Sequence, residues 1–268
     1  MGFEAEHLEL AALADLHAAA TPVLVDSLGL QTLERDGALV SVAGALPSSA
    51  IVINRTIGIG LTSAASEDTV RAAVAAYGEA EVGRYFVQVH PEARPGELTD
   101  WLRAEGLEQA RGWQKFQRGR DAVPEVRTDL RVAQIGPEKG EAFGRLVCDA
   151  FDLGEAAVPW LARLPGRPGW HIFMSFDGEE AAGAGALFVK DGLAWSDFGA
   201  TALKHRRRGS QSALLAQRIR HALEVDCRQI FTCTGVQVPG DPQHSYNNIR
   251  KMGFREDYVR DNYAPPKR

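Results

Sequence analysis

Cysteine and long apolar runs are scarce in this sequence, and each scarcity excludes a class of protein. Only three cysteines occur among 268 residues, Cys148, Cys227 and Cys233, and no two form a CxxC pair. This odd, scattered set argues against a disulfide framework and against a structural zinc site. No stretch approaches the roughly 18 consecutive apolar residues of a membrane helix, and the start lacks the pattern of a signal peptide. We therefore expect a cytoplasmic protein with no membrane partner.

Positive charge is also in short supply. Lys and Arg number 30 against 35 Asp and Glu, which gives a formal net charge of −5. An acidic chain carries no broad footprint for nucleic acid, so we expect no nucleic-acid partner, although the basic run 205–208 is the one feature that would favour it. The length suits two modest domains or one large domain.

Apolar patterns divide the chain into two halves that each alternate between strands and helices. In the first half, residues 50–61 read as a strand pair or one long bent strand, residues 85–90 read as another strand, and Ser66 reads as a helix start. A Pro-containing segment, 119–129, is the best linker. In the second half, strands are expected at 130–135, 171–176, 181–190, 194–201, 229–236 and 256–263, with helices at 139–151, 208–224 and 245–252. The pair Asp177–Gly178 is a turn signal that joins the strands at 171–176 and 181–190. This alternation predicts an α/β or α+β layered fold.

The segment HRRRGSQS, residues 205–212, lies between a strand and a long amphipathic helix. Arg218 and Arg220 fall off the apolar face of that helix. Backbone N–H groups at a helix start lack intrahelical partners and carry partial positive charge. Gly209 would let a ligand approach closely, and the serines and arginines add donors and charge, which favours a phosphate site. The same residues also fit a solvated basic turn with a serine cap.

Two motifs in the second half resemble those of the GNAT N-acetyltransferase superfamily. Arg206, Gly209 and Gln211 stand at the three defining places of the family's acyl-CoA loop, [Q/R]xxGx[G/A]. Gln211 replaces the expected small residue, which implies a tighter loop around the pyrophosphate. The segment SYNNIRKMGF, residues 245–254, resembles the family's second signature, and Asn248 sits five residues before Gly253.

The resemblance implies that residues 126–268 form an acetyl-CoA-binding domain. It implies that the pantetheine arm pairs with exposed backbone of the strand at 198–203. The residues expected to bind the cofactor are Thr201, Leu203, Arg206, Arg208, Gly209, Ser210, Gln211, Ser212 and Asn248.

The first half resembles a second, degenerate copy of the same fold, over residues 1–122. The stretch NRTIGIGLTSAASEDTV resembles a strand that runs into a helix, but the basic pyrophosphate loop is missing. The whole chain is therefore interpreted as two GNAT-like domains in tandem, each a mixed, mostly antiparallel twisted sheet flanked by helices. Such a chain is expected to be a monomer or a homodimer.

The catalytic residues are harder to assign. The family commonly has a tyrosine that acts as general acid four residues before the glycine of the GF pair, but in this sequence Ile249 occupies that position. Tyr246 is the candidate substitute, with a core aromatic as the alternative. Asp197 is the first candidate base, with Asp177 and Glu180 behind it; Cys233 reads as a buried structural cysteine rather than a nucleophile.

The function predicted from this resemblance is N-acetyl transfer from acetyl-CoA to a primary amine. The acceptor, a small molecule or a peptide, is not identified, because one scaffold in this superfamily serves many acceptors. The alternative is a catalytically weak acyl-CoA-binding regulatory module, which the isoleucine at position 249 favours.

Overall fold

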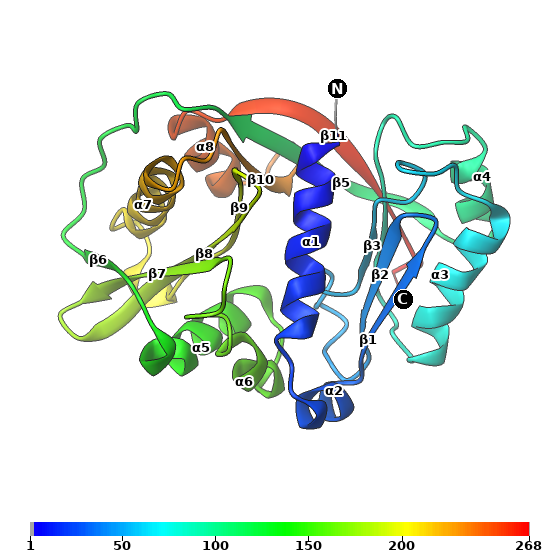
Figure 1. Cartoon of the computed structure of the whole chain (residues 1–268), viewed down its shortest axis with the longest axis horizontal. Helices are drawn as coiled ribbons and strands as arrows, with labels where there is room; N and C mark the ends of the chain where they lie inside the picture. The colour runs from blue at the N-terminus through cyan, green and yellow to red at the C-terminus, as the bar shows by residue number, and fades with distance from the viewer. Residues whose placement is uncertain (1–2, 268) are drawn as a thin grey trace. The chain divides into compact units, whose positions relative to one another are not determined.

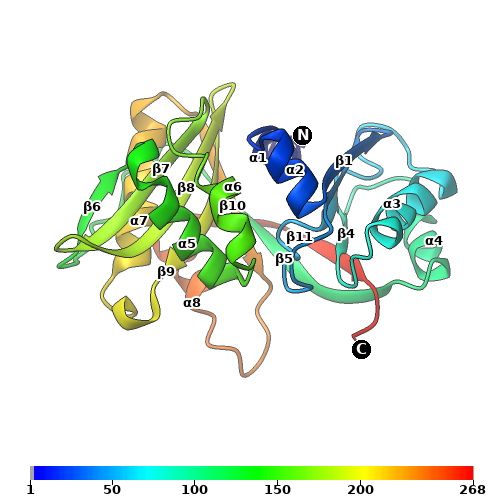
Figure 2. The same ribbon diagram turned by 90° about the horizontal axis from the view of Figure 1, so that it is seen from below.

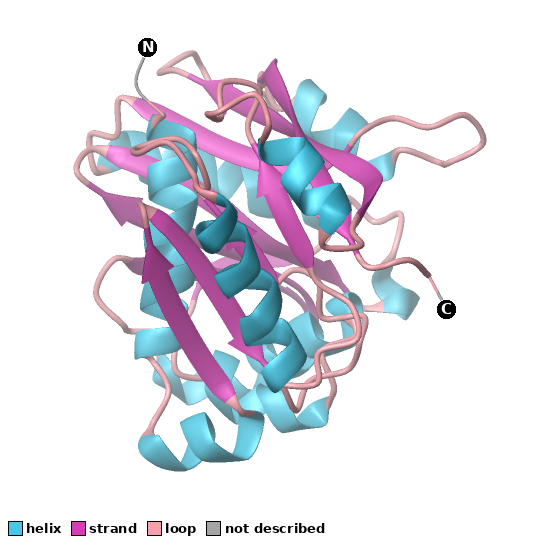
Figure 3. Cartoon of the chain, turned by 90° about the vertical axis from the view of Figure 1, so that its right-hand side faces the viewer, coloured by secondary structure: helices cyan, strands magenta, loops and turns pink. Residues whose placement is uncertain are grey.

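The computed structural model describes residues 3–267 and shows a mixed α/β fold in which helices flank a mixed sheet (Figure 3). The chain forms two compact units. The first comprises Met1–Gln114 and Tyr258–Arg268, and the second comprises Lys115–Asp257. Each unit is described by itself below.

Two strands change unit along their length. Strand β5 (Glu108–Arg118) gives its last residues to the second unit, and β11 (Arg255–Ala264) gives most of its residues to the first. The predicted boundaries, 1–122 and 126–268, do not anticipate this exchange, because they assign the last strand wholly to the second half. The physical reason is pairing: β11 lies antiparallel to β4, with Asn262 opposite Gln88.

The first unit is a sheet in the order β1–β2–β3–β4–β11–β5. Its pairs are antiparallel from β1 to β3, parallel between β3 and β4, and antiparallel between β4 and β11. The predicted helix start at Ser66 is confirmed, since its hydroxyl and that of Thr69 form a capping box. The other elements are α1 (Glu4–Ala18), α2 (Pro22–Leu28), β1 (Leu30–Arg35), β2 (Ala38–Ala43), β3 (Arg55–Ile57), α3 (Glu67–Glu79), β4 (Phe86–Val89) and α4 (Leu98–Ala104).

Strand β3 is much shorter than the strand predicted over residues 50–61. Gly58 and Gly60 end it with φ angles of +85° and +75°, which a strand does not contain. The apolar residues before β3 lie in turns instead of a strand, although Ile53 is fully buried. The β-branched residues of 50–61 therefore predict burial correctly, but they predict a strand only for its short central part, β3.

Helix α1 carries two carboxylates into the interior of the first unit. Glu6 and Glu9 are 1% and 0% exposed, and Arg260 of β11 donates to both, with Nη1–O distances of 2.9 Å and 2.7 Å. Arg55 of β3 forms a further ion pair with Glu9. Trp113 lies beside both guanidinium groups. Paired in this way, the buried charges fix α1 on the sheet and on the last strand.

Among the described residues, no single helix is both long and apolar enough to cross a bilayer; α1 and α2 pass that test only as a pair, and the chain bends by 105° between them.

The second unit has the sheet order β5–β10–β9–β8–β7–β6. Strands β9 and β10 pair in parallel, and the strands from β6 to β9 pair antiparallel with their neighbours. The predicted hairpin at Asp177–Gly178 is confirmed, since Asp177 lies opposite Glu180. The elements are β6 (Arg131–Gln134), η1 (Pro137–Lys139), α5 (Gly140–Phe151), η2 (Glu155–Ala157), α6 (Val158–Leu161), β7 (Trp170–Asp177), β8 (Glu180–Lys190), β9 (Leu193–Thr201), η3 (Leu203–His205), α7 (Ser210–Glu224), β10 (Gln229–Gly235) and α8 (His244–Lys251).

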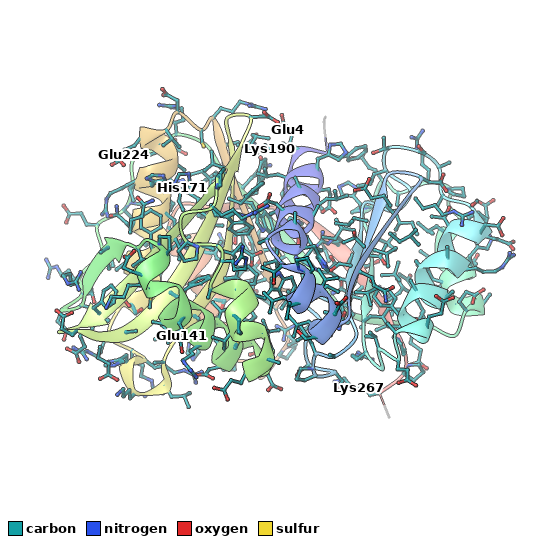
Figure 4. All side chains as sticks on the ribbon, turned by 60° about the horizontal axis from the view of Figure 1, so that its bottom comes forward. Glu4, Glu141, His171, Lys190, Glu224 and Lys267 are labelled. Carbon is teal, nitrogen blue, oxygen red and sulfur yellow. The ribbon has the colours of Figure 1, made fainter. Side chains whose placement is uncertain are left out.

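Helices α7 and α5 cover opposite faces of this sheet (Figures 1 and 2). Charged side chains on their outer faces, such as Glu141 of α5 and Glu224 of α7, point into solvent (Figure 4). Trp160 and Trp195 are almost fully buried beneath them. Tryptophans, aliphatic residues and small alanines on the strands thus build a core against which both helices pack.

Candidate functional site

Strands β9 and β10 separate at the middle of the second unit's sheet. They pair only from Leu193 to Trp195, and the Thr232 hydroxyl donates to the Ser196 carbonyl at 2.9 Å just beyond. On its other side, β9 stays bound to β8, where the Ala202 N–H donates to the Ala182 carbonyl at 2.9 Å. Successive residues of a strand direct their N–H and C=O groups to opposite edges. Because Ala202 faces β8, the N–H and C=O groups of Thr201 face the open side. An extended ligand could add to β9 there.

A bulge distorts β9 within this open stretch. The pairing of β8 with β9 shifts register between Ala184 and Ala186, and Phe198 has a φ angle of +47°. A positive φ is strained for a bulky residue and persists only where the surroundings enforce it. The Phe198 ring is 4% exposed and contacts the rings of Phe151 and Trp170. Aromatic packing from α5 and β7 therefore helps to hold the bulge.

Asp197, the first candidate base, precedes the bulge and is half-buried. Its carboxylate accepts from the Trp195 indole at 3.0 Å and from the Phe198 N–H at 2.8 Å. Both donors belong to β9 itself, so this side chain orients the strained backbone. The other two candidates are engaged by cations: Asp177 pairs with Arg208 and Glu180 pairs with Lys204.

Gly209 marks the start of α7 in the way that the sequence predicts. Its φ is +81°, and a Cβ atom placed there would lie 2.7 Å from the carbonyl oxygen of Arg127. The Thr128 hydroxyl donates to the carbonyl of Arg208 at 2.7 Å, which fixes the loop against the segment before β6. Both the backbone conformation and the close packing require glycine.

The three arginines before Gly209 differ in their surroundings. Arg206 and Arg207 are exposed. Arg208 instead forms ion pairs with Asp129 and, at 2.5 Å, with Asp177. Hydrogen bonds from its guanidinium hold the pKa of both carboxylates below the usual range. This arrangement differs from the expectation that Arg208 would offer its charge to a phosphate, because carboxylates already engage it.

Ser210 and Gln211 tie the first turn of α7 to the sheet. The Ser210 hydroxyl lies 2.8 Å from that of Ser175, and both side chains are buried. The Gln211 amide donates to the carbonyl of Ala200 at 2.5 Å and to the hydroxyl of Thr201 at 2.8 Å. The glutamine at this position therefore reaches back onto the open part of β9.

Ser212 and Asn248 are brought together by the fold. The Ser212 hydroxyl donates to Asn248 Oδ1 at 2.7 Å, which joins α7 to α8. Leu203, predicted to line the same site, is 75% exposed just after β9. Apart from Arg208, the predicted cofactor residues thus gather around one end of α7 and one edge of β9.

Tyr246 lies in the hydrophobic core of the second unit. It is 6% exposed and its ring meets that of Phe116 edge-on, with centroids 5.0 Å apart. Burial and, to a smaller extent, the Glu256 carboxylate raise the pKa of Tyr246 to about 12. Ile249, at the position usual for the acid, is buried in the same core. The geometry matches the core-aromatic alternative.

Two further residues, His205 and Arg218, lie around this site. His205 is buried, with its ring nitrogens 3.7 Å from Asp177 and from Glu180, so it belongs to the charged cluster that fixes the loop. Arg218 was expected off the apolar face of α7, yet it is 4% exposed beneath β9. Helix periodicity missed it because apolar residues alone defined the buried face. The glycine at position 185 of the facing strand is the one sequence signal of the space it fills.

In the first unit, the chain itself covers the backbone that follows β3. After β3, the Gly60 carbonyl accepts from the Arg94 N–H, and the Ala65 N–H donates to the Arg94 carbonyl, each at 2.8 Å. A Cβ atom at Gly60 would lie 2.6 Å from that carbonyl. No ligand could add to this backbone without displacing the segment around Arg94.

Comparisons with known proteins identify the fold. No protein-family model and no curated protein matches the chain. Among solved structures, a GCN5-related N-acetyltransferase from Kribbella flavida matches with a TM-score of 0.61 and 17% identity, covering 95% of this chain and 96% of its own. A GCN5-related N-acetyltransferase from Sphaerobacter thermophilus matches with a TM-score of 0.58 and 14% identity, covering 90% of this chain and 84% of its own. A conserved protein of unknown function from Staphylococcus epidermidis matches with a TM-score of 0.56 and 6% identity, covering 92% of this chain and 98% of its own. The chain therefore has the fold of GNAT acetyltransferases.

Proposed function

We propose that the second unit binds acetyl-CoA and transfers its acetyl group to a primary amine. One observation carries this proposal: the open edge of β9 leads directly into the glycine-marked start of α7. The edge offers backbone groups to an extended pantetheine arm, and the helix start offers N–H groups to phosphate. The first unit is proposed to be a silent copy of the same fold, since the chain itself covers the backbone that follows β3.

The residues present fit this ligand. The positive φ of Gly209 turns the chain into α7, and the first N–H groups of that helix would receive the phosphate oxygens. Arg206 and Arg207 supply exposed positive charge, whereas Arg208 fixes the loop through Asp129 and Asp177. Acetyl-CoA supplies the reactive thioester; the chain orients it along β9 and admits the amine at the bulge. Asp197 remains the candidate base there.

Charge on the loop should separate the roles of its arginines. Replacing Arg206 with glutamine is expected to weaken acetyl-CoA binding about tenfold, because a charge-assisted hydrogen bond to phosphate is lost. Replacing Arg208 with glutamine is expected to change the affinity less than about threefold, since carboxylates already neutralise this cation. Calorimetric titration of both variants measures the difference. Equal losses in the two variants would contradict the assignment.

Removing the Tyr246 hydroxyl should leave turnover almost unchanged. The Tyr246→Phe variant keeps the edge-on contact with Phe116, and the hydroxyl that it removes is bonded to Glu256 of β11. We expect the rate of acetyl transfer to stay within about threefold of the parent, whereas loss of a general acid costs about a hundredfold or more. A loss of that size would identify Tyr246 as the acid after all.

The proposed activity is tested by incubating the protein with acetyl-CoA and a panel of amines that includes polyamines, amino acids and peptides. Thiol release and mass spectrometry of the acceptor report turnover. An acetylated acceptor supports the transferase. Tight binding of acetyl-CoA without turnover of any amine would favour the second candidate, a regulatory module that binds acyl-CoA. The buried Ile249 at the acid position is the observation that keeps this second candidate in view.

A further inference from the structure

The guanidinium of Arg218 is buried behind β9 without a carboxylate bound to it. Its Nη1 donates to the Ser196 hydroxyl at 2.7 Å and to the Asp197 carbonyl at 2.9 Å, and its Nε donates to the carbonyl of Leu214 at 3.2 Å. Among the described residues, none of its hydrogen bonds reaches a carboxylate. Burying a cation without a bound anion is costly, so its retention calls for an explanation.

The strand in front of α7 is shaped to admit this side chain. A Cβ atom at Gly185 of β8 would lie 2.7 Å from the Arg218 Cζ, so a glycine is needed there. Burial lowers the pKa of Arg218 to about 10, while the Asp197 charge opposes the change. The guanidinium therefore stays protonated near neutral pH and places a permanent positive charge behind β9.

The other arginines buried to the same extent have compensating partners. Arg260 is bound by Glu6 and Glu9. Arg118 donates to the Met252 carbonyl at the C-terminal end of α8, where the helix dipole supplies partial negative charge. Arg218 lies in the body of α7, where its hydrogen bonds reach neutral acceptors and the nearby Asp197 charge offsets only part of the cost of burial. From this contrast we expect a negative charge of the bound ligand to lie near the Arg218 guanidinium.

The position of that partner follows from the proposed function, on which this inference rests. With the diphosphate at the start of α7, the pantetheine arm runs back along β9 from Thr201. The three residue steps from Thr201 to Phe198 span about 10 Å of strand, which places the thioester beside Phe198, next to the carbonyl that Arg218 holds. We propose that Arg218 is a positioning residue that fixes the bulge and stabilises negative charge developing on the thioester oxygen.

The step is a direct transfer in which Arg218 exchanges no atom. The amine lone pair forms the C–N bond as the carbonyl electrons move onto oxygen. When the carbonyl re-forms, the C–S bond breaks and its electron pair leaves with the thiolate. The amine proton passes to the Asp197 carboxylate, the candidate base, and from there to solvent water. A preorganised positive charge lowers the barrier to the first of these events, and it offsets the missing tyrosine at position 249.

Infrared spectroscopy tests this role without an acceptor. The carbonyl stretch of bound 13C-labelled acetyl-CoA should lie below that of free acetyl-CoA in the parent and return towards the free value in Arg218→Met. Arg218→Lys should recover part of the shift. Arg220→Met is the matched control, since Arg220 is exposed on the same helix and should leave the stretch unchanged. With a reactive amine, Arg218→Met should lower kcat about a hundredfold and change the KM for acetyl-CoA less than about threefold.

The outcomes separate this inference from the function on which it rests. If the parent binds acetyl-CoA and Arg218→Met leaves both the stretch and kcat unchanged, the role of Arg218 is overturned and the acetyltransferase stands. If the parent does not bind acetyl-CoA, both fall. Should Arg218→Met fail to fold, Ser196→Ala removes only the shortest bond to the guanidinium. That variant should show a smaller change in the same direction, and an unchanged stretch would again overturn the role.

Discussion

Replacing Arg260 with methionine is expected to lower the free energy of unfolding by about 3–5 kcal/mol. Arg260 is 0% exposed and bonds both Glu6 and Glu9, so the variant removes the cation that these two buried carboxylates share, while Arg55 still pairs with Glu9. Methionine keeps much of the side-chain volume, which confines the loss to charge and hydrogen bonds. Urea denaturation of the full chain, followed by tryptophan fluorescence, measures the change.

Two companion variants show whether the loss comes from unpaired charge. Arg103→Met removes an exposed arginine that pairs with Asp100, and it should cost less than about 1 kcal/mol. Adding Glu6→Gln to the Arg260→Met variant should cost little more, because that carboxylate has already lost its cation. Additive losses, or a variant as stable as the parent, would contradict the account of the buried cluster.

Replacing Gly209 with valine is expected to weaken acetyl-CoA binding at least about a hundredfold. A valine at a φ of +81° is strained, and its Cβ would lie 2.7 Å from the Arg127 carbonyl, so the loop must move. The moved loop no longer presents the first N–H groups of α7 to phosphate. Calorimetry with acetyl-CoA measures the affinity.

Gly240→Val is the matched control for this variant. Gly240 has a φ of +83°, and nothing lies within 4 Å of a Cβ atom built there. It shares the left-handed strain of Gly209 without the clash, so it should lose about 1 kcal/mol of stability and keep its affinity within about threefold. If both valine variants lost binding equally, general destabilisation would explain the result and the loop assignment would fail.

Local features of the second unit could be predicted because they depend on neighbours in the chain. Asp177–Gly178 indicated the hairpin, and Gly209 indicated the start of α7 next to the strand that ends at Thr201. The pairing of Ser212 with Asn248 is in keeping with the two motifs that the sequence placed at one site. Each of these depends on turn chemistry or on short patterns that adjacent residues determine.

Other features depend on contacts between distant segments, which a linear pattern does not contain. The exchange of β11 follows from its pairing with β4, more than 160 positions earlier in the chain. Asp129 and Asp177 engage Arg208 only after folding brings the ends of β6 and β7 to the loop. Arg218 falls off the apolar face of the predicted helix, yet the Ser196 hydroxyl and the Asp197 carbonyl bond its guanidinium in the interior. Charged residues are seldom buried, so helix periodicity does not predict this position.

Calorimetric titration of the purified protein with acetyl-CoA tests the central claim most directly. The account predicts one site per chain with micromolar affinity, formed by the open edge of β9 and the start of α7. Desulfo-CoA should bind as well, since the diphosphate and pantetheine carry the contacts. A folded protein that shows no binding of either ligand would contradict the account, and the acetyltransferase fold would then serve a different ligand.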